Sequence, residues 1–386
     1  MTVSIHEART AREMRAFIEY PLSLYRNDSF YAPQLTRDLK THFSTKNPFF
    51  RHASARYFLA YRSGEIVGRV ASIVNRLHND YHRDRTGFFG FYESIDDPAA
   101  AGALLGSVEE DLRARGMDTV RGPMNFSTNE ELGFLVEGFD EPSILMTPYN
   151  KRYYDALMAA CGYGKVRDLY AFLHDVRDAL PEKILRAAAI AEKRGITAHQ
   201  LKKSEFPAAM RAFKDIFNSA WSDNWGFVPM TDEEIEDSVR LLQPIIKPEV
   251  MALAFHSGEP VGFIGMVPDY NVVLRQMRGR LTPITVMKAL YYSRKITDLR
   301  MLLLGVKKEY RNKGVDGILF REAFKGVKSG GYKRVEFSWI LEENLSTIRL
   351  AEMIGSRRWK VFRIYERRMP EAGSGEFRHS HNNPTA

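Results

Sequence analysis

The sequence predicts an α+β protein made of two tandem copies of one mixed domain, each a mostly antiparallel sheet flanked by helices. Its 386 residues are 44% hydrophobic and 27% charged, which is a globular composition, and this length favours two domains over one. The chain also passes twice through one order of strand, helix, β-hairpin, strand, helix, strand, helix and strand. An order repeated over so long a stretch indicates a duplicated domain.

The first copy is expected at residues 1–178. Two β-rich runs in ARYFLAYRSGEIVGRVASIVN meet at Ser63-Gly64, which is typical of a hairpin turn. Asp96 and Asp97 before PAAAGALLGSVEEDLRARG, and Gly116 at its end, indicate a helix there. The remaining elements are strands at VSIHEA, TGFFGFYES, MDTVRGP and RDLYAFLHDV, and helices at TAREMRAFIEYPLSLY and NKRYYDALMAACGY.

The second copy is expected at residues 196–370, after a helical connector at 179–195. Its hairpin, VMALAFHSGEPVGFIGMVPD, turns at Ser257-Gly258. The other elements are strands at ITAHQLK, DLRMLLLGVKKEY, KRVEFSWI and RWKVFRIYERRM, and helices at FPAAMRAFKDIFNSAW, GVDGILFREAFKGVKSGG and NLSTIRLAEMIG. Residues 371–386 are polar and contain Gly and Ser, so we expect a disordered tail.

Composition narrows the class of protein. No apolar run reaches membrane-spanning length, and the N-terminus lacks the apolar core of a signal peptide. Cys161 is the single cysteine, and the ten His have no paired spacing, so we expect no disulfide and no metal site. These features predict a cytoplasmic protein. The net charge of +8 fits an anionic cofactor or peripheral contact with the inner membrane face, and no signature predicts a nucleic-acid partner.

The segment YRNKGVDG, residues 310–317, lies between an expected strand and an expected helix. Apolar residues recur every four positions from Val315 to Val327, which gives the helix one apolar face. The helix N-terminus presents free N–H groups and the positive end of the helix dipole. Two glycines beside the helix N-terminus would admit a bulky group, Gly314 and Gly317. Two basic side chains there would attract an anion, Arg311 and Lys313. The segment therefore fits a pyrophosphate, although such a turn also arises for purely geometric reasons.

This segment resembles the acyl-CoA pyrophosphate loop of the GNAT acyltransferase superfamily, with Arg311 and Gly314 at the matching positions. Asp316 stands where that loop usually has a second small residue. Asn344 and Gly355 also fit the family pattern of a helix start and a glycine before the last strand. The resemblance covers most of residues 3–369, by motif in the second half and by element order in the first. It implies acyl-CoA, with an acetyl or longer acyl group, bound by Leu304, Gly305, Val306, Arg311, Asn312, Lys313, Gly314, Val315, Asp316, Gly317 and Asn344.

The first copy lacks the loop. After GFFGFYES comes IDDP, with two acids and no matching arginine and glycine. Acidic side chains repel an anion. We therefore expect the first copy to have a degenerate CoA loop and only the second to bind the cofactor.

In the superfamily an amine attacks the thioester directly, so the resemblance implies an N-acyltransferase without a covalent intermediate. Backbone N–H groups of residues 304–306 would stabilise the thioester oxygen. Three acids at strand ends or beside the loop are candidates for the proton acceptor, or are solvated turn acids: Glu93, Asp269 and Glu309. Tyr365, Tyr310 or a water molecule would protonate the leaving thiolate, although core packing explains Tyr365 better.

Two irregular segments bear on the acceptor. Residues 121–150 form a long polar stretch that would cover the acceptor cleft through Asn125, Ser127, Asn129 and Glu130, or would be a surface loop satisfying its own backbone. Residues 270–296 mix apolar and basic side chains. They would form an extra helix pair, or a flap that takes up a lipid chain or lies on an anionic membrane.

Three functions remain open on the sequence. The first is an acyl-CoA-dependent N-acyltransferase acting on a small polar amine or a long-chain, sphingoid-type amine. The second is a tRNA-dependent aminoacyl transferase, since paired GNAT-like domains also occur in peptidoglycan-bridging enzymes. The third is a non-catalytic binding protein that kept the fold. Binding of acyl-CoA separates the first from the other two.

Overall fold

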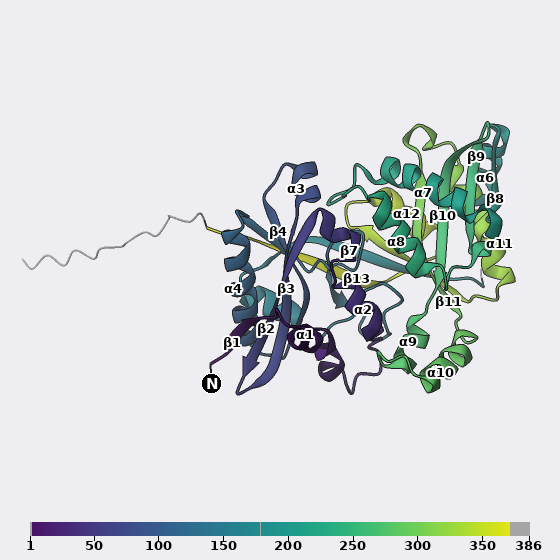
Figure 1. The fold of residues 1–386 in the computed structure, drawn as a ribbon. Helices are drawn as coiled ribbons and strands as arrows, with labels where there is room; N and C mark the ends of the chain where they lie inside the picture. The colour runs from purple at the N-terminus through teal and green to yellow at the C-terminus, as the bar shows by residue number, and fades with distance from the viewer. Residues whose placement is uncertain (1, 178, 371–386) are drawn as a thin grey trace, which may run out of the picture.

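The computed structural model describes residues 2–177 and 179–370, which form two similar halves (Figure 1). The predicted tail, residues 371–386, lies outside the described residues. The first half contains β1 (Ser4–Glu7), α1 (Ala11–Leu24), α2 (Thr36–His42), η1 (Pro48–Arg51), β2 (Ala53–Arg62), β3 (Glu65–Asn75), α3 (Arg76–His82), β4 (Thr86–Ser94), α4 (Pro98–Ala114), β5 (Thr119–Gly122), β6 (Phe134–Glu137), α5 (Tyr154–Ala160) and β7 (Gly164–Asp175). The second contains α6 (Glu182–Lys193), β8 (Ile196–Gln200), η2 (Lys203–Glu205), α7 (Phe206–Trp221), α8 (Asp232–Leu242), η3 (Pro248–Val250), β9 (Met251–His256), β10 (Glu259–Pro268), α9 (Asn271–Met277), α10 (Pro283–Ser293), β11 (Asp298–Val306), η4 (Lys308–Tyr310), α11 (Val315–Ser329), β12 (Arg334–Leu341), α12 (Leu345–Met353) and β13 (Arg357–Arg368).

One sheet of 13 strands joins the halves. Its order is β1-β2-β3-β4-β5-β13-β7-β12-β11-β10-β9-β8, with β6 beside β13. Counted inward from either edge of the sheet, the strands follow the same order. β8 to β12 occupy the same places in the second half as β1 to β5 do in the first. The pairs β4–β5 and β11–β12 are parallel, and the other strand pairs in the described chain are antiparallel. The predicted α+β fold with a duplicated domain is confirmed.

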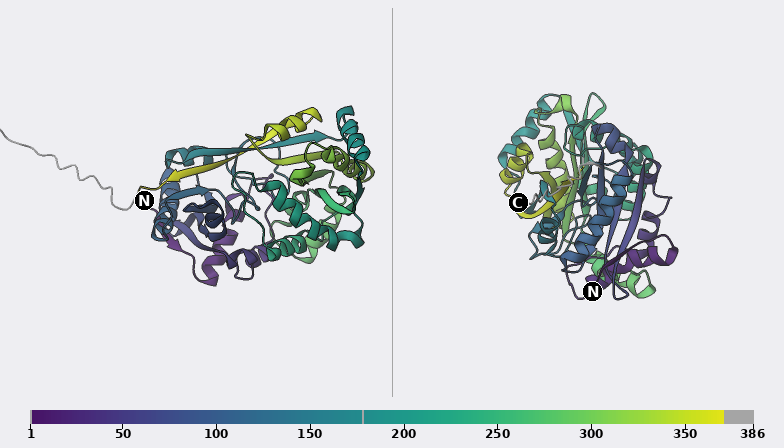
Figure 2. Two further views of the ribbon diagram at one scale, coloured as in Figure 1. Left: turned by 90° about the horizontal axis from the view of Figure 1, so that it is seen from above. Right: turned by 90° about the vertical axis from the view of Figure 1, so that its left-hand side faces the viewer.

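The last strands of the two halves are exchanged. β7 belongs to the first half in sequence but pairs with β12, and β13 belongs to the second half but pairs with β5. β7 and β13 also pair with each other, so they form the centre of the sheet. Figure 2 shows both strands running lengthwise from one half into the other. The boundaries at 178 and 196 stay a prediction, since hydrogen bonds of the sheet cross between the halves.

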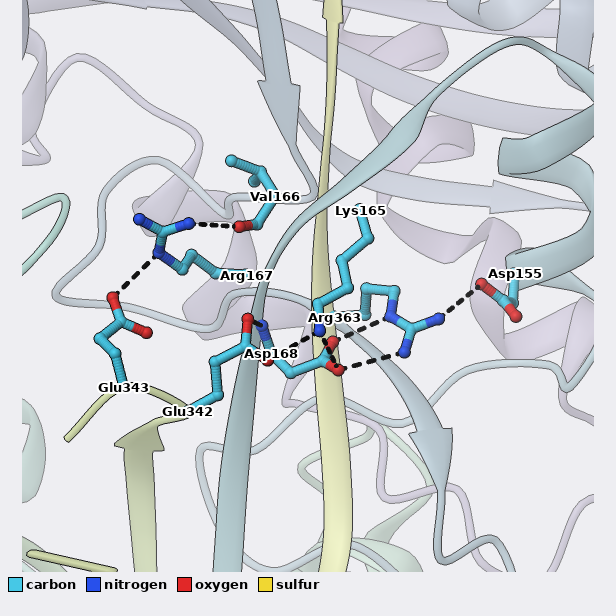
Figure 3. Close-up of polar contacts among 8 residues, drawn as sticks. All are labelled: Asp155, Lys165, Val166, Arg167, Asp168, Glu342, Glu343 and Arg363. Atoms are coloured by element: carbon cyan, nitrogen blue, oxygen red, sulfur yellow. Dashed lines mark hydrogen bonds and ion pairs between the residues drawn. The ribbon is translucent and has the colours of Figure 1, made fainter. Parts of the chain in front are cut away.

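A cluster of ion pairs fixes the exchanged strands (Figure 3). The Asp168 carboxylate accepts a hydrogen bond from Arg363 Nε at 2.8 Å and lies 2.8 Å from Lys165 Nζ. Lys165 Nζ also contacts Glu342 at 2.7 Å. Burial alone would raise the pKa of Asp168, but the bonds from Arg363 and Lys165 prevail and hold it below its usual value. Two further ion pairs adjoin the cluster: Arg167 with Glu343 at 2.9 Å and Arg363 with Asp155 at 3.6 Å.

Local signals in the sequence explain most elements. Both predicted hairpins turn at a Ser-Gly pair with positive φ, 51° and 83° at Ser63 and Gly64, and 52° and 86° at Ser257 and Gly258. The predicted apolar face of α11 is buried at Val315, Leu319, Ala323 and Val327. Residues 270–296 form the helix pair α9 and α10. None of the helices in the described residues has both the length and the apolar character required to cross a bilayer.

Candidate active site

Two parallel strands of the second half separate and open a cleft. β11 pairs with β12 only where residues 298–301 face residues 334–337. Beyond that point β11 stays paired with β10, while β12 pairs with β7. A cavity of about 1420 Å³ lies between them, lined by Leu304 and Val306 of β11 and by Ser338 and Ile340 of β12. The free edge of β11 therefore presents backbone groups that a ligand can bond.

The N-terminus of α11 faces this cavity. Arg311, Asn312, Val315 and Asp316 line it, and the N–H groups of the first helical turn have no partner inside the helix. The Arg311 guanidinium donates a hydrogen bond to the carbonyl oxygen of Ala220 at 2.8 Å. The carboxylate of Asp316 has neither a hydrogen bond nor an ion pair within the described chain. The site thus combines a helix N-terminus and an arginine, which favour an anion, with one carboxylate that opposes it.

The two glycines of the loop have a structural explanation. Gly314 has a φ of 84°, and a Cβ there would lie 2.2 Å from the carbonyl oxygen of Ala187 in α6. A Cβ at Gly317 would lie 2.7 Å from the Ala187 side chain. Packing against the connector helix α6 therefore explains both glycines, and their contact with a ligand stays a prediction.

Three other predicted cofactor residues lie close to the loop. Asn344 lines the cavity and its Oδ1 accepts a hydrogen bond from Thr347 N at 3.2 Å, so it caps α12. A Cβ at Gly305 would lie 2.6 Å from the Trp221 ring, so this glycine admits a helix side chain. Lys313 Nζ lies 4.7 Å from the centre of the Tyr310 ring and does not line the cavity.

Helices α7 and α8 form a long apolar wall of the cavity. Phe217 and Trp221 stack with ring centroids 5.0 Å apart. The cavity follows β11 from Arg300 to Val306, which corresponds to about 20 Å of extended strand. Typical pockets for small ligands measure about 300–1,000 Å³, so this one is large. Side chains of the wall include Phe213, Phe217, Trp221, Ile235, Val239 and Leu242.

Part of the predicted acceptor segment lines the cavity. Asn129 and Glu130 do so, and His42 Nε2 lies 3.2 Å from the Glu130 carboxylate. Burial disfavours a charged imidazole, but the Glu130 carboxylate outweighs burial and raises the pKa of His42. The other two predicted residues hold the segment in place. Asn125 Oδ1 accepts a hydrogen bond from Phe91 N at 2.7 Å, and Ser127 Oγ accepts one from Asn129 N at 3.2 Å.

Arg300 is a buried cation in the cavity wall. Its Nη1 donates a hydrogen bond to the carbonyl oxygen of Leu145 at 3.0 Å, and its Nε donates to Ser338 Oγ at 3.1 Å. Its Nε lies 3.9 Å from the Glu336 carboxylate. Burial lowers the pKa of Arg300 to about 10. Arg300 thereby joins both separated strands to the 121–150 segment, and an arginine inside the apolar run DLRMLLLGV was the sequence signal for it.

Two of the predicted catalytic acids are held inside the protein. Glu93 is buried and accepts hydrogen bonds from the hydroxyls of Tyr25 and Tyr154, both at 2.7 Å, and burial raises its pKa. Asp269 accepts from Leu145 N at 2.9 Å, and burial raises its pKa to about 7. Neither carboxylate lines the cavity. Both carboxylates accept hydrogen bonds within the fold, and a catalytic role for either stays a prediction.

Glu309 and Tyr365 also lie away from the cavity. Glu309 is exposed in η4, just before the loop. Tyr365 is buried in the core of the first half, where its hydroxyl donates a hydrogen bond to Asp155. Tyr310, the alternative donor, does line the cavity, and its hydroxyl lies 3.1 Å from His256 Nδ1.

In the first half the equivalent gap between parallel strands is filled by the chain itself. β4 and β5 pair only where residues 86–88 face residues 119–121. Beyond them, Met124 N donates a hydrogen bond to the carbonyl oxygen of Phe89 at 2.8 Å. A Cβ at Gly90 would lie 2.1 Å from the Met124 carbonyl oxygen. The chain around Met124 therefore fills the place that corresponds to the cleft of the second half.

The helix that follows β4 is also closed at its N-terminus. The Asp97 carboxylate accepts hydrogen bonds from Ala99 N at 3.2 Å and Ala100 N at 3.1 Å, and it pairs with Arg62. These N–H groups correspond to those that α11 leaves free. A carboxylate from the chain therefore stands where the second half presents open N–H groups to the cavity.

A family model, two related proteins and a solved structure resemble this chain. The family model described as "Acetyltransferase (GNAT) family" matches residues 210–355. The chain is 32% identical over 373 residues to the bacterial ceramide synthase of Caulobacter vibrioides, covering 95% of this chain and 97% of that protein. It is 31% identical over 363 residues to protein YghO of Escherichia coli, covering 92% and 93%. A solved tandem GNAT protein from the clavulanic acid biosynthesis pathway superposes with a TM-score of 0.55 at 12% identity, over 95% of this chain and 98% of that one, which shows the shared fold.

Proposed function

The chain is a tandem two-domain member of the GNAT acyltransferase family, and we propose that it transfers an acyl group from acyl-CoA to the amino group of a long-chain, sphingoid-type amine. One observation carries this proposal. A single cavity joins the N-terminus of α11, which suits a phosphate group, to the apolar wall of α7 and α8, which suits hydrocarbon. A reaction that joins a CoA thioester to a lipid needs both surfaces in one site.

The proposed cofactor site lies in the second half only. The family normally uses acyl-CoA, and the diphosphate would lie at the N-terminus of α11 beside Arg311, whose guanidinium forms strong hydrogen bonds with phosphate. The acyl thioester would lie along the free edge of β11, where Leu304 and Val306 line the cavity. Backbone N–H groups on that edge would stabilise the oxyanion as the amine attacks. The filled gap and capped helix of the first half support assigning one cofactor per chain.

The size and lining of the cavity support a lipid acceptor over a small polar one. A small amine would occupy a minor part of about 1420 Å³ and would make little use of the apolar wall that α7 and α8 form. The ceramide synthase relative covers nearly the whole chain, which supports an amine of the sphingoid class. Such an amine is a membrane lipid and would reach the cavity from the inner membrane face.

We assign Glu130 as the group that takes a proton from the ammonium group of the acceptor, so that the free amine can attack the thioester. Four acids of the described chain line the cavity. Asp223 lies 2.8 Å from Lys308 and Glu343 lies 2.9 Å from Arg167, so both are neutralised by ion pairs. Asp316 lies at the phosphate end. Glu130 also has a partner, but that partner is His42, a group that gains and loses a proton near neutral pH and is positioned to pass the proton onward.

The test uses purified protein with palmitoyl-CoA and sphinganine, and follows release of the free CoA thiol. Turnover of this pair well above that of acetyl-CoA with a small amine such as ethanolamine is expected. Arg311→Ala should raise the KM for acyl-CoA about tenfold with a smaller change in kcat, because it removes a charged contact far from the thioester. Absence of acyl-CoA binding by calorimetry would refute the proposal and favour a tRNA-dependent or non-catalytic protein.

A further inference from the structure

The α9–α10 hairpin exposes an unusual amount of apolar surface. α10 has no buried residue, and Met287 and Ile284 are 72% and 69% exposed. Six of the eleven large apolar side chains that are exposed in the described chain belong to this short stretch: Leu281, Ile284, Val286, Met287, Leu290 and Tyr291. Single exposed apolar residues are common on proteins, whereas a contiguous group of them marks a surface that contacts something.

The same hairpin is strongly basic. Residues 270–297 contain six Lys and Arg residues and no Asp or Glu. Five of the basic residues are exposed: Arg278, Arg280, Lys288, Arg294 and Lys295. Lys295 Nζ lies 4.2 Å from the centre of the Tyr291 ring. Apolar side chains with tyrosines and long basic side chains beside them match the boundary between lipid tails and anionic headgroups.

The hairpin is fixed to the body of the protein by its other helix. Val273 and Met277 of α9 are buried, and the carbonyl oxygen of Gly279 accepts a hydrogen bond from Thr36 N of the first half at 3.0 Å. Figure 1 shows α9 between the sheet and α10, with α10 at the lower edge of the molecule. α10 is therefore held outward by a packed support.

Two partners suit an exposed apolar helix, a second copy of this chain and a lipid surface, and the charge of the hairpin favours the lipid surface. If a second copy of this chain covered α10 in a symmetric dimer, the five exposed cations of each hairpin would meet those of the other, and like charges repel. An anionic lipid surface accepts both the cations and the apolar side chains. We propose that the α9–α10 hairpin docks the protein on an anionic membrane surface, with the apolar side chains of α10 inserted between headgroups. This inference rests on the surface alone and does not require the proposed acyl transfer.

The experiment measures co-sedimentation of the full chain with vesicles. Wild-type protein should bind vesicles of phosphatidylglycerol and phosphatidylcholine, should bind pure phosphatidylcholine vesicles at least tenfold more weakly, and should dissociate as salt is added. The variant Ile284→Ser/Met287→Ser/Leu290→Ser, whose three sites are exposed, should bind the anionic vesicles at least tenfold more weakly. Arg278→Glu/Arg280→Glu should have a similar effect.

The matched control is Leu185→Ser/Ile190→Ser/Leu241→Ser, which removes three exposed apolar side chains elsewhere and should bind as the wild type does. Equal vesicle binding by the α10 variant and the control would overturn the proposal. So would a wild-type dimer, seen by analytical ultracentrifugation, that the α10 variant abolishes, because a second copy would then cover the helix. Circular dichroism of each variant separates loss of binding from loss of fold.

Discussion

Replacing Val239 by Phe tests whether the α8 wall of the cavity holds a hydrocarbon chain. Val239 lines the cavity and packs with the apolar cluster that contains Phe213 and Phe217. A phenyl group at this position extends into space that about two or three methylene groups of a bound chain would occupy. The variant changes neither the N-terminus of α11 nor the free edge of β11.

The size of the effect follows from burial of the chain. Each methylene group removed from water contributes about 0.8 kcal/mol, so displacing two or three of them costs about 2 kcal/mol. Expressed as kcat/KM, this is a loss of about 30-fold for a substrate pair with a long chain at the wall. A pair whose chains are too short to reach the wall should lose less than about twofold.

The assay compares kcat/KM for palmitoyl-CoA and acetyl-CoA, each with sphinganine and with a short-chain amine. This design shows whether the acyl chain or the chain of the amine lies at α8. Leu241→Phe is the matched control, because it also introduces a phenyl group into α8 but at an exposed position that does not line the cavity. A loss that is equal for all four substrate pairs would refute the reasoning, since it would reflect damage to the fold or to the chemistry.

Three further predictions concern single side chains. Asp316→Asn removes an unpaired negative charge beside the phosphate end, so the Kd for acyl-CoA measured by calorimetry should fall about three- to tenfold at low salt, and a weaker affinity would contradict this. Asp168→Asn should lower the free energy of unfolding in urea by about 2 kcal/mol at neutral pH. Because the folded state holds the pKa of Asp168 below its unfolded value of about 4, this stability is present above that pH and is lost as pH falls through the folded pKa, so wild type and variant should converge in acid. Gly314→Ala should lower the free energy of unfolding by at least ~2 kcal/mol, measured by thermal unfolding, because its φ of 84° and the nearby Ala187 oxygen both oppose a side chain. Gly102→Ala is the control, and it should leave the stability of the protein unchanged, because the space around Gly102 is open.

Much of the fold was predictable because local signals agree with the tertiary structure. The Ser-Gly turns set both long hairpins, and the apolar repeat from Val315 to Val327 set the buried face of α11. The exchange of β7 and β13 was not predictable. Both halves end in a strand of the same kind, and either strand fits either place in the sheet, so the order of elements along the chain is identical with and without the exchange.

The site was predictable where a backbone feature defines it. The turn at Arg311 and Asn312 follows from a strand meeting a helix, and the structure lines the cavity with it. Glu93 and Asp269, which were proposed from strand ends, do not line the cavity, because a strand end does not define the direction of the side chain. The apolar wall was also missed, since Phe217 or Val239 in an amphipathic helix has the same spacing whether it packs in a core or lines an open cavity.

Because of the strand exchange, both halves of the chain contribute residues to the cavity. The gap between β4 and β5 of the first half is filled, yet Leu169 of β7 and Glu130 of its irregular segment both line the cavity of the second half. β7 also supplies the hydrogen bonds along β12, which would otherwise be an unpaired edge beside the cleft. The cavity thus has walls from both halves, so the first half contributes to the site of the second even though its own strand gap is filled. The filled gap around Met124 also anchors the start of the segment from Asn125 to Glu130, whose last residue lines the cavity.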